Sequence, residues 1–584
     1  MKALQYLNKY LYQYRVKLAV GILITVIARV FSLFAPRLIG NSITAAEEFL
    51  NDPNGDLAAL KATLLLNIAI IVGTALLSGF FTFLMRQTII NVSRYIEYDL
   101  KNEVFEQYLR LSQVFYKNNR TGDLMNRISE DVGKVRMYVG PAIMYSINTV
   151  ALFVIVISYM ISIAPQLTLY TIIPLPLLSF LIYKLSRIIN IRSTKVQETL
   201  SKLSSFTQES FSGISVLKSY NLQAQNSGDF DTLAQESQDK NMALVRVQAW
   251  FFPLMILLIG ISNLLVIFIG GKQYIADEIT IGVLAEFIIY VNMLTWPVAV
   301  VGWITSIVQQ AEASQERINA FLKERPQIVD GPGVTSNTPA PLVFDKVSLY
   351  YPETEIMALQ GLDLVVEKGT TLGIVGAVGS GKSTLLDLIC RLYDPSEGSI
   401  RLGDHSLTEF KIEELRSRIG YVPQNPFLFS QTILENIQFG NANASFEHIK
   451  KAAENAAVAD NIEAFENKYK TVLGERGVTL SGGQKQRVSL ARALVKDPEI
   501  LLLDDCLSAV DTDTEETILN NLKKLRKNKT TLIVSHRLSS IIEADQIIVL
   551  DRGKIIQKGI HQTLVKSPGY YQELFIKQQS EKEN

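Results

Sequence analysis

A glycine-rich segment, GAVGSGKST from Gly376 to Thr384, has the residue types and spacing that point most directly to chemistry. An apolar strand-like run, TLGIVG, leads into it, and the apolar helical segment LLDLICRLY follows. In such a loop the glycines let backbone N–H groups turn towards phosphate oxygens, and the helix N-terminus adds its dipole. Lys382 would bring a cation to the β- and γ-phosphates, and Ser383 would offer an oxygen to Mg²⁺. A glycine-rich turn without a ligand is disfavoured, because the strand, the helix and all pattern positions occur together.

A second strand of the expected phosphate site is the apolar run ILLL, which ends at Asp504. From Leu342 onward short β-branched runs alternate with helical segments, which is the pattern of an α/β fold with a largely parallel sheet. The carboxylate of Asp504 would emerge at the C-terminal edge of that sheet, where Mg²⁺ sits in such nucleotide sites. An apolar strand that ends in aspartate is common, but after a phosphate-binding loop it predicts a metal ligand.

The composition indicates that part of the chain is embedded in a membrane. Hydrophobic residues make up 48% of the 584 residues, charged residues make up 20%, and the mean hydropathy is +0.18. Lys and Arg total 57, as do Asp and Glu, so the formal net charge is zero and no basic bias predicts nucleic-acid binding. Two cysteines, Cys390 and Cys506, exclude a disulfide scaffold and fit a reducing compartment.

Long charge-free stretches in the first half predict six membrane spans, because a bilayer core needs roughly 20 apolar residues per helix. The first, second, fifth and sixth spans are expected at about Lys17–Arg37, Ala62–Met85, Val247–Gly271 and Ile281–Ala311. The third and fourth share the run Met137–Tyr183, which contains no Asp, Glu, Lys or Arg. Ala164-Pro165 interrupts this run, so we expect a tight hairpin there.

The charges that flank the spans predict the topology. Basic residues precede the first span and acidic residues follow it, which places the N-terminus in the cytoplasm: Lys2, Lys9, Arg15 and Lys17 before, and Glu47, Glu48, Asp52 and Asp56 after. An even number of spans returns the C-terminal half to the cytoplasm. We therefore expect a multi-pass protein of the cytoplasmic membrane with both termini inside.

Two cytoplasmic excursions, about Arg86–Arg136 and Lys184–Arg246, read as helices that continue out of the membrane. Each has a break near its middle, at Phe115–Leu124 and Ser210–Tyr220, and spacing alone would make these simple helix–helix turns. A Pro/Gly/Ser/Thr-rich stretch follows the last span and has the composition of a linker. The expected domains are a transmembrane domain at residues 1–325, a linker at 326–341 and a nucleotide-binding domain at 342–584.

The segment LSGGQKQR, Leu480–Arg487, lies between the phosphate loop and Asp504, and with it the chain resembles the ATP-binding cassette (ABC) transporters. LSGGQ after a phosphate loop is highly specific. Other similarities follow in the family's order: Tyr351 in LYYPE, Gln424 in YVPQNPFLF, LGERG at Leu473–Gly477, SAVD at Ser508–Asp511 and His536 in IVSHRLSS. The resemblance covers the whole chain, and six spans before one cassette is the layout of an exporter half-transporter.

The resemblance implies a polytopic α-helical transmembrane domain with long intracellular helices, fused to an α/β P-loop ATP-binding cassette domain. It also implies that the breaks near 115–124 and 210–220 are coupling helices. The implied catalytic residues are Asp505, His536 and Gln424, and the implied Mg²⁺ ligands are Ser383, Gln424 and Asp504. The implied ATP-binding residues are Tyr351, Gly376, Ala377, Val378, Gly379, Ser380, Gly381, Lys382, Ser383, Thr384, Ser481, Gly482, Gly483 and Gln484.

The resemblance further implies a dimer, because one chain carries six spans and one cassette where the family works with twelve and two. ATP would lie between two cassettes, and their closure would switch the membrane cavity from inward-facing to outward-facing. The expected function is ATP-driven export or flipping of an apolar or amphipathic drug, lipid or peptide. An ATP-gated channel or regulatory subunit is an alternative, and an importer is disfavoured because importer cassettes are usually separate chains.

Asp505 departs from the family pattern, which usually has a glutamate after the metal-binding aspartate. An aspartate is shorter by one C–C bond of about 1.5 Å, and a general base must come within about 2.6–3.2 Å of its proton or act through one further water. Hydrolysis at this site should therefore be slow. The same aspartate occurs in members that pair with a different subunit, which favours a heterodimer. His536 is retained, so a homodimer that uses Asp505 as its base stays open.

A few polar and aromatic residues of the expected spans are candidates for substrate contact. Arg29 lies mid-span, where a charge is costly, so it should face a cavity or a partner. An anionic substrate or lipid headgroup is one possibility, and a structural pair with Glu286 is the other. Phe287, Trp296 and Trp303 could line an aromatic cavity, although helix packing or anchoring at the membrane interface explains them equally well.

Overall fold

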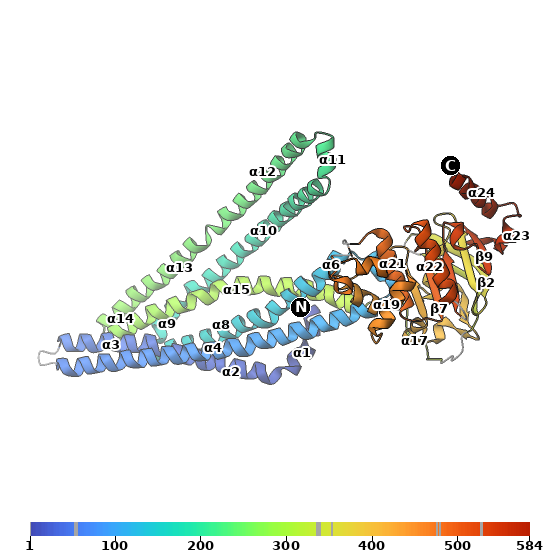
Figure 1. Cartoon of the computed structure of the whole chain (residues 1–584). Coiled ribbons are helices and arrows are strands. Elements are labelled where there is room, and N and C mark those ends of the chain that lie inside the picture. Colours follow the sequence, from blue (N-terminus) through green and yellow to red (C-terminus); the bar gives the residue numbers. More distant parts are fainter. Residues whose placement is uncertain are drawn as a thin grey trace. The chain divides into compact units, whose positions relative to one another are not determined.

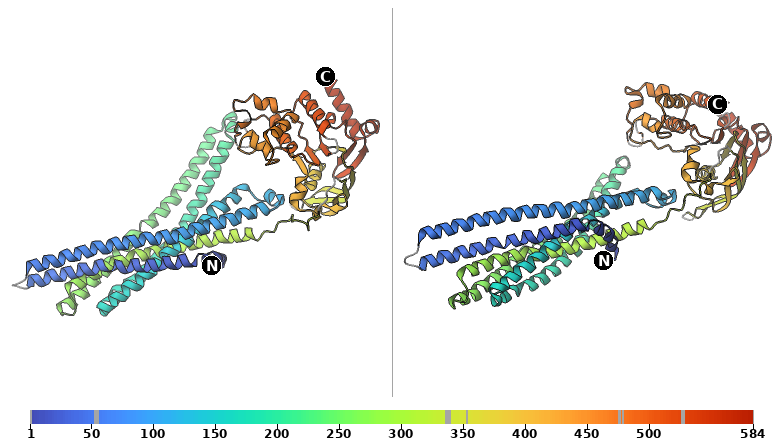
Figure 2. Two further views of the ribbon diagram at one scale, coloured as in Figure 1. Left: turned by 60° about the horizontal axis from the view of Figure 1, so that its bottom comes forward. Right: turned by 90° about the horizontal axis from the view of Figure 1, so that it is seen from below.

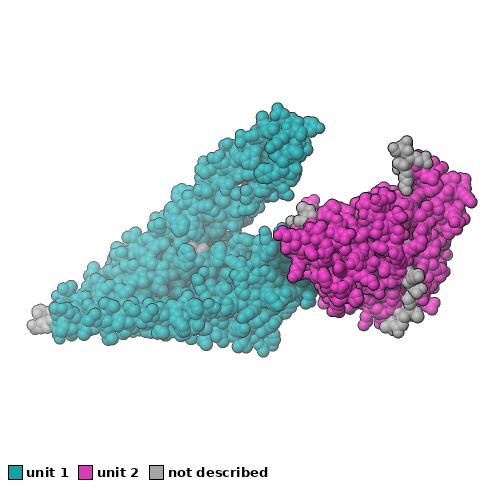
Figure 3. Space-filling view, viewed as in Figure 1, with its two compact units in different colours: residues 1–109, 122–324 teal, residues 110–121, 325–584 magenta. Residues whose placement is uncertain are grey.

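The computed structural model describes residues 2–51, 56–334, 340–351, 354–474, 477, 480–525 and 529–583. These residues form two compact units (Figure 3). Unit 1 consists of Met1–Leu109 and Gly122–Glu324, and unit 2 of Arg110–Thr121 and Arg325–Asn584. Of the expected linker at 326–341, positions 335–339 lie outside the described residues.

Unit 1 is entirely helical in its described residues. Its elements begin with a 3-10 turn at Ala3–Leu7, and its α-helices are α1 (Asn8–Gln13), α2 (Arg15–Ser32), α3 (Phe34–Asn51), α4 (Leu57–Arg110), α6 (Thr121–Asn126), α7 (Val132–Met137), α8 (Ile143–Ile163), α9 (Pro165–Ile172), α10 (Pro174–Ser212), α11 (Ile214–Ser219), α12 (Gln223–Gln248), α13 (Phe251–Leu265), α14 (Gly271–Ile275) and α15 (Ile281–Leu322). Wider π-helical turns occur at Arg127–Asp131, Tyr138–Ala142 and Val266–Gly270.

Five helical segments of the described chain are long and apolar enough to cross a membrane, namely Arg15–Asn51, Leu57–Arg110, Thr121–Ile163, Gln223–Ile275 and Ile281–Leu322. Each contains one of the expected spans. The remaining expected span, the fourth, falls on α9 and the start of α10, which are separated at Ile173. The hairpin expected at Ala164-Pro165 is a break between α8 and α9, where Ala164 has non-helical φ and ψ of −145° and 87°.

The second of the two expected excursions forms a long helical hairpin. Helices α10 and α12 pack side by side and project away from the other helices of unit 1, with α11 at the tip (Figures 1 and 2). The first excursion is formed by α4 and α6, and between them lies α5 (Gln113–Asn118). The expected breaks at 115–124 and 210–220 therefore coincide with two short helices that join long ones.

Unit 1 holds its first and last membrane helices together at a crossing of small residues. A Cβ atom added to Gly282 of α15 would lie 2.1 Å from the carbonyl oxygen of Gly40 in α3. Such a close approach of two backbones requires glycine and is a common means of packing helices in a bilayer. A buried apolar cluster that includes Met160, Phe287 and Tyr290 packs around the C-terminal part of α8 and the N-terminal part of α15.

The described residues of unit 2 contain two β-sheets. The four-stranded antiparallel sheet has the order β2-β1-β4-β5, with β1 at Leu342–Tyr351, β2 at Ile356–Val366, β4 at Glu397–Leu402 and β5 at His405–Ser406. The six-stranded sheet has the order β10-β9-β3-β8-β7-β6, with β3 at Thr371–Gly376, β6 at Ile419–Val422, β7 at Ile500–Asp504, β8 at Thr530–Val534, β9 at Gln546–Asp551 and β10 at Lys554–Gly559. Among the described strands of the second sheet, only β10 is antiparallel to its neighbour.

The central strands are covered on both faces, which explains their uninterrupted apolar sequences. Every residue of β3, β7 and β8 is buried. The α-helices of unit 2 are α16 (Lys382–Ile389), α17 (Ile412–Ser417), α18 (Ile433–Gln438), α19 (Phe446–Asn455), α20 (Ala459–Glu463), α21 (Gly482–Leu494), α22 (Thr512–Leu525), α23 (His561–Leu564) and α24 (Tyr570–Glu583), together with α5 from the first excursion. The expected combination of a transmembrane helical domain with an α/β domain is confirmed.

Candidate functional site

The phosphate loop, Gly376–Thr384, runs from the end of β3 to the start of α16, as its flanking sequences predict. Gly381 has a φ of +99°, and a Cβ atom added to it would lie 2.5 Å from the Ala358 carbonyl oxygen. This position therefore requires glycine for both its conformation and its space. Gly379 is likewise in the left-handed region, with a φ of +79°. The loop can turn back on itself in this way and direct backbone N–H groups to an anion.

Lys382 is buried at the first position of α16. Its Nζ donates hydrogen bonds to the carbonyl oxygens of Gly376 at 2.9 Å and of Ala377 at 2.8 Å. Burial lowers the pKa of Lys382, and the nearby charges of Asp505 and Asp504 oppose that effect. The ammonium group is thus held over the phosphate loop by neutral acceptors, and a phosphate group could replace them as its partner.

Asp504 ends β7 and is buried beside Ser383. Burial raises the pKa of Asp504, against the opposing effects of the Ser383 hydroxyl and of the nearby Lys382 and His536. A divalent cation bound here would offset the cost of burying the carboxylate. Mg²⁺ usually takes one or two protein ligands and completes its shell with waters and substrate phosphates, so one carboxylate and one hydroxyl fit this ion.

Asp505 has a left-handed backbone, with a φ of +45°, and its side chain is buried. Its N–H donates to the carbonyl oxygen of Val534 at 2.9 Å. Its Oδ1 accepts a long hydrogen bond, 3.4 Å, from the N–H of His536. The structure therefore brings together Asp505, which follows Asp504 at the end of β7, and His536, which follows β8.

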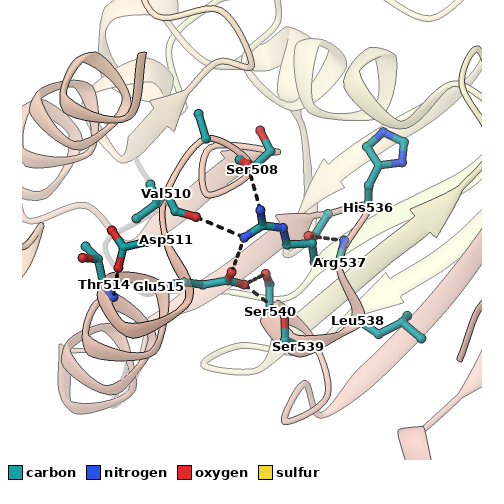
Figure 4. Close-up of polar contacts among 12 residues, drawn as sticks. Ser508, Val510, Asp511, Thr514, Glu515, His536, Arg537, Leu538, Ser539 and Ser540 are labelled. Atoms are coloured by element: carbon teal, nitrogen blue, oxygen red, sulfur yellow. Dashed lines mark hydrogen bonds and ion pairs between the residues drawn. The ribbon is translucent and has the colours of Figure 1, made fainter. Parts of the chain in front are cut away.

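His536 and Gln424 flank the same edge of the six-stranded sheet. His536 comes two residues after β8 and Gln424 two residues after β6, and both strands are parallel to β7. The His536 carbonyl oxygen accepts a hydrogen bond of 2.7 Å from Nε2 of Gln578 in α24. Figure 4 shows the His536 ring directed away from the neighbouring Arg537 side chain. Gln424 is exposed.

Tyr351 ends β1 and belongs to an aromatic group of unit 2. Its ring meets that of Tyr393 edge to face, with centroids 5.3 Å apart, and its hydroxyl lies 3.4 Å from Oγ1 of Thr384. Lys117 of α5 places its Nζ 5.5 Å from the centroid of Tyr351 and 5.0 Å from that of Tyr393. Burial alone would lower the pKa of Lys117, but the Tyr393 phenol beside it raises it above its ordinary value.

The signature segment, Leu480–Gln484, opens the 13-residue helix α21. Ser481 is the N-cap: its Oγ accepts from the N–H of Gln484, whose side chain accepts from the N–H of Ser481. Ser481 and Gly482 are exposed. The last glycine, Gly483, packs so closely on the following loop that an added Cβ would lie 2.6 Å from the Ala509 carbonyl oxygen. The N–H groups at this helix start could bind an anion, as those of the phosphate loop could.

Several neighbours of the site carry no motif of their own. Asp387 of α16 accepts a hydrogen bond of 3.3 Å from the Tyr421 hydroxyl, and burial raises its pKa to about 6. Tyr393, Lys117 and Arg537 likewise contact motif residues or the segments that adjoin them. The sequence signals for these residues were weak: Asp387 lies one turn after Ser383 on α16, and Arg537 directly follows His536.

The expected substrate residues of the membrane unit separate into different roles. Arg29 donates from Nε to Oδ1 of Asn148 at 2.5 Å. Glu286 instead accepts from the Tyr290 hydroxyl at 2.7 Å, so the alternative of an Arg29–Glu286 pair does not describe this structure. Phe287 is fully buried within the apolar cluster and is therefore a packing residue. Trp303 packs edge to face on Tyr145.

Comparison with known proteins identifies the class to which this fold and site belong. The family model described as "ABC transporter transmembrane region" matches residues 18–298, and that described as "ABC transporter" matches residues 359–508. The multidrug resistance-like ATP-binding protein MdlA of Escherichia coli is 36% identical over 96% of this chain and 94% of the relative. The probable multidrug resistance ABC transporter protein YheI of Bacillus subtilis is 33% identical over 97% of this chain and 96% of the relative.

A lipid transporter and a solved structure are also similar. An ATP-dependent lipid A-core flippase of Alkalilimnicola ehrlichii is 31% identical over 87% of this chain and 86% of the relative. The structure of a bacterial Atm1-family ABC exporter with ATP bound superposes with a TM-score of 0.80 at 26% identity, covering 97% of this chain and 99% of the other. The chain belongs to the ABC transporters. It is a multi-pass membrane protein of the exporter type, in which an ATPase domain drives transport.

Proposed function

We propose that this chain is one half of a dimeric exporter that moves a hydrophobic or amphipathic drug, lipid or peptide across the cytoplasmic membrane, with both termini inside. Residues 1–325 would form the translocation half, and residues 342–584 would bind ATP, with the linker at 326–341 between them. The observation that supports this proposal most strongly is that one cassette has two separate segments suited to bind an anion, the phosphate loop and the exposed start of α21. Two cassettes arranged head to tail would enclose each triphosphate between one segment of each kind.

The tip of the α10–α12 hairpin supports a dimer. Two large apolar side chains of this tip, Phe211 and Tyr220, are 71% and 74% exposed, and Ile214 and Val216 between them are also exposed. An apolar tip on a helical hairpin that projects from its own unit marks a contact surface for another molecule. We propose that this tip docks on the cassette of the second half-transporter.

The site residues divide into binding and hydrolytic roles in this proposal. The phosphate loop and Lys382 would hold the phosphates, Tyr351 would stack on adenine, and the partner's signature segment would close the site. Ser383, Asp504 and Gln424 would hold Mg²⁺, which neutralises phosphate charge when bound. Asp505 would face the attacking water as a weak base, and His536 would stabilise the developing charge. The hydrogen bond from the His536 backbone N–H to the Asp505 carboxylate, which holds both residues at the same edge of the sheet, supports this assignment.

We further propose that the second half-transporter is a different chain that carries glutamate at the position of Asp505. The short side chain of Asp505 and its hydrogen bond to the His536 backbone both hold its carboxylate against the protein and back from the attacking water. The intact signature segment of this chain would then complete the stronger ATP site on the partner. A homodimer that uses Asp505 as a weak base is the second candidate, supported by the presence of His536.

Steady-state ATPase activity of the chain purified alone in lipid tests these two candidates. The Lys382→Ala variant supplies the background rate. We expect the wild-type rate to stay at that background, because the chain alone brings no glutamate base. A clear rate above the background would instead identify a homodimer in which Asp505 suffices.

The aromatic group around Lys117 predicts an effect on ATP affinity. Replacing Lys117 with methionine removes a cation from the rings of Tyr351 and Tyr393 and is expected to raise the KM for ATP about two- to fivefold, the range of a cation–π contact. Lys117→Arg keeps the cation and should retain the wild-type KM. Measurement of ATP affinity with the full transporter checks this result, and equal KM values for Lys117→Met and wild type would contradict it.

Replacing Arg29 is expected to change the response of the transporter to its substrate rather than its hydrolysis of ATP. Its partner Asn148 is neutral, so its charge remains available to an anionic group. Arg29→Ala is expected to weaken stimulation of ATPase by an anionic lipid or drug about tenfold, the scale of one charge-assisted hydrogen bond, while basal ATPase stays intact. Arg29→Lys should keep most of the response. Unchanged substrate competition in Arg29→Ala would assign Arg29 to helix packing. The relatives named for multidrug resistance and for lipid A-core flipping support the choice of these probes.

A further inference from the structure

The side chain of Arg537 joins two segments that border the nucleotide chemistry (Figure 4). It lies directly after His536 and reaches the loop formed by residues 508–511, which connects β7 to α22 and is called here the 508–511 loop. Its Nη2 donates to the Ser508 carbonyl oxygen at 3.1 Å, and its Nη1 donates to the Val510 carbonyl oxygen at 3.1 Å. One guanidinium group thus binds the backbone of the loop at two points.

A buried carboxylate fixes this guanidinium. Glu515, in the first turn of α22, is only 3% exposed and accepts from Nη1 of Arg537 at 2.8 Å. Ser540 and Ser539 donate their hydroxyls to the other oxygen of Glu515, at 2.5 and 3.1 Å. Because a buried carboxylate needs both a charge partner and hydrogen bonds, this set of contacts is cooperative and holds Arg537 in one position.

The 508–511 loop is hydrogen-bonded on one side to Asp505 and on the other to α21, the helix that the signature segment opens. The Ser508 hydroxyl donates to the Asp505 carbonyl oxygen at 2.9 Å, which links the loop to the hydrolytic side. The Ala509 N–H donates to Oε1 of Gln486 at 3.3 Å, which links the loop to α21 and so to the signature segment. Any shift of the loop would therefore move both Asp505 and the signature segment.

The segment that carries His536 is held from its other side by the C-terminal helix. Gln578 of α24 accepts from the Leu538 N–H at 2.9 Å and donates to the His536 carbonyl oxygen at 2.7 Å. Arg537 lies between these two anchored residues. The backbone around His536 is thus fixed by Gln578, while the Arg537 side chain fixes the loop against it.

We propose that Arg537 is a positioning residue that locks the 508–511 loop to the His536 segment, so that hydrolysis at one ATP site responds to occupancy of the other. The inference rests on the proposed dimer, in which the signature segment and the Asp505–His536 pair of one chain serve different ATP molecules. Arginine is required because its planar fork reaches two carbonyl oxygens and a carboxylate at once, whereas a lysine ammonium is a single point.

The test compares Arg537→Lys with a matched arginine in the complete transporter in lipid. Arg416 of unit 2 also donates to two backbone carbonyl oxygens, those of Cys390 at 3.1 Å and Arg391 at 2.9 Å, but lies on α17 outside the site. Arg537→Lys is expected to lower kcat about tenfold, the scale of one lost charge-assisted hydrogen bond, with KM for ATP unchanged and with lower cooperativity in ATP. Arg416→Lys should leave all three values unchanged.

Amide hydrogen exchange supplies a readout that is independent of ATPase activity. In Arg537→Lys the amides of residues 508–511 and 536–540 should exchange faster, while those of the phosphate loop keep their rate. Glu515→Gln, which preserves shape and one acceptor, should give the same pattern with a smaller change. Equal exchange of both segments in wild type and Arg537→Lys would overturn the proposed role. Absence of wild-type ATPase in every dimer tested would overturn the proposed function, and the exchange result would still decide the role of Arg537.

Discussion

Replacing Lys382 with alanine is expected to reduce ATP hydrolysis by about 10²- to 10³-fold, the range seen when one preorganised donor to a developing charge is lost. The ammonium of Lys382 is held over the phosphate loop by the Gly376 and Ala377 carbonyl oxygens. Its removal takes away both the cation for the phosphates and two hydrogen bonds that shape the loop. We therefore expect ATP binding to weaken together with kcat, which equilibrium ATP binding and steady-state ATPase of the complete transporter would measure.

The chain offers a matched lysine for this experiment. Lys496 also donates from Nζ to two backbone carbonyl oxygens, those of Arg416 at 2.5 Å and Ile419 at 2.9 Å, and burial lowers its pKa as it does for Lys382. Lys496→Ala should cost folding stability without a selective loss of ATP binding. Equal losses of ATP binding in the two variants would show that Lys382 acts through loop stability alone.

The strands and the loop of the nucleotide site were predictable because local sequence determines them. The run TLGIVG has the composition of a strand buried on both faces, and the glycines that follow suit only a loop with left-handed backbone such as that at Gly381. Asp504 ends the next apolar run and emerges at the edge where parallel strands place their ligands. The signature segment was recognised from its amino-acid motif, and the Ser481 capping box explains why a helix starts there.

The membrane unit was predictable in outline and less so in detail. A charge-free run long enough for two crossings predicted the hairpin at Ala164, and hydropathy located the other helices. The partner of Arg29 was not predictable, because Asn148 carries no charge and lies on another helix. Phe287 could equally have lined a cavity or a core, and only the packing of α8 against α15 shows that it is buried.

Contacts between residues far apart in sequence were beyond prediction from patterns. Lys117 comes from the first of the two expected excursions, yet it belongs to unit 2 and contacts Tyr351 and Tyr393 there. Arg537 adjoins a recognised histidine, but its hydrogen bond to Glu515 depends on where the fold places the first turn of α22. Neither pairing repeats at a helical or strand period, and so neither leaves a local signal.

Asp505→Glu is expected to raise ATP hydrolysis at this site about tenfold or more in the purified complex, within the 10²- to 10⁴-fold range of a general base. The added methylene would carry the carboxylate away from the His536 backbone N–H, which Asp505 now contacts at 3.4 Å, and towards the attacking water. A cost in stability is also expected, because the left-handed backbone at this position, with a φ of +45°, suits aspartate better than glutamate. Steady-state ATPase and a thermal melt of the same preparation measure the two effects separately.

Asp505→Asn is the matched variant, since it keeps the size of the side chain and tolerates the left-handed backbone while removing the base. If Asp505 is a weak base, this variant should fall to the rate of Lys382→Ala at this site, and the glutamate variant should rise above wild type. If the site serves only to bind ATP and hold the dimer closed, the asparagine variant should match wild type. A rise with glutamate would then show that the short side chain of Asp505 alone suppresses hydrolysis. No rise with glutamate would contradict the geometric argument and would place the cause in the surrounding segments, of which the 508–511 loop adjoins Asp505 directly.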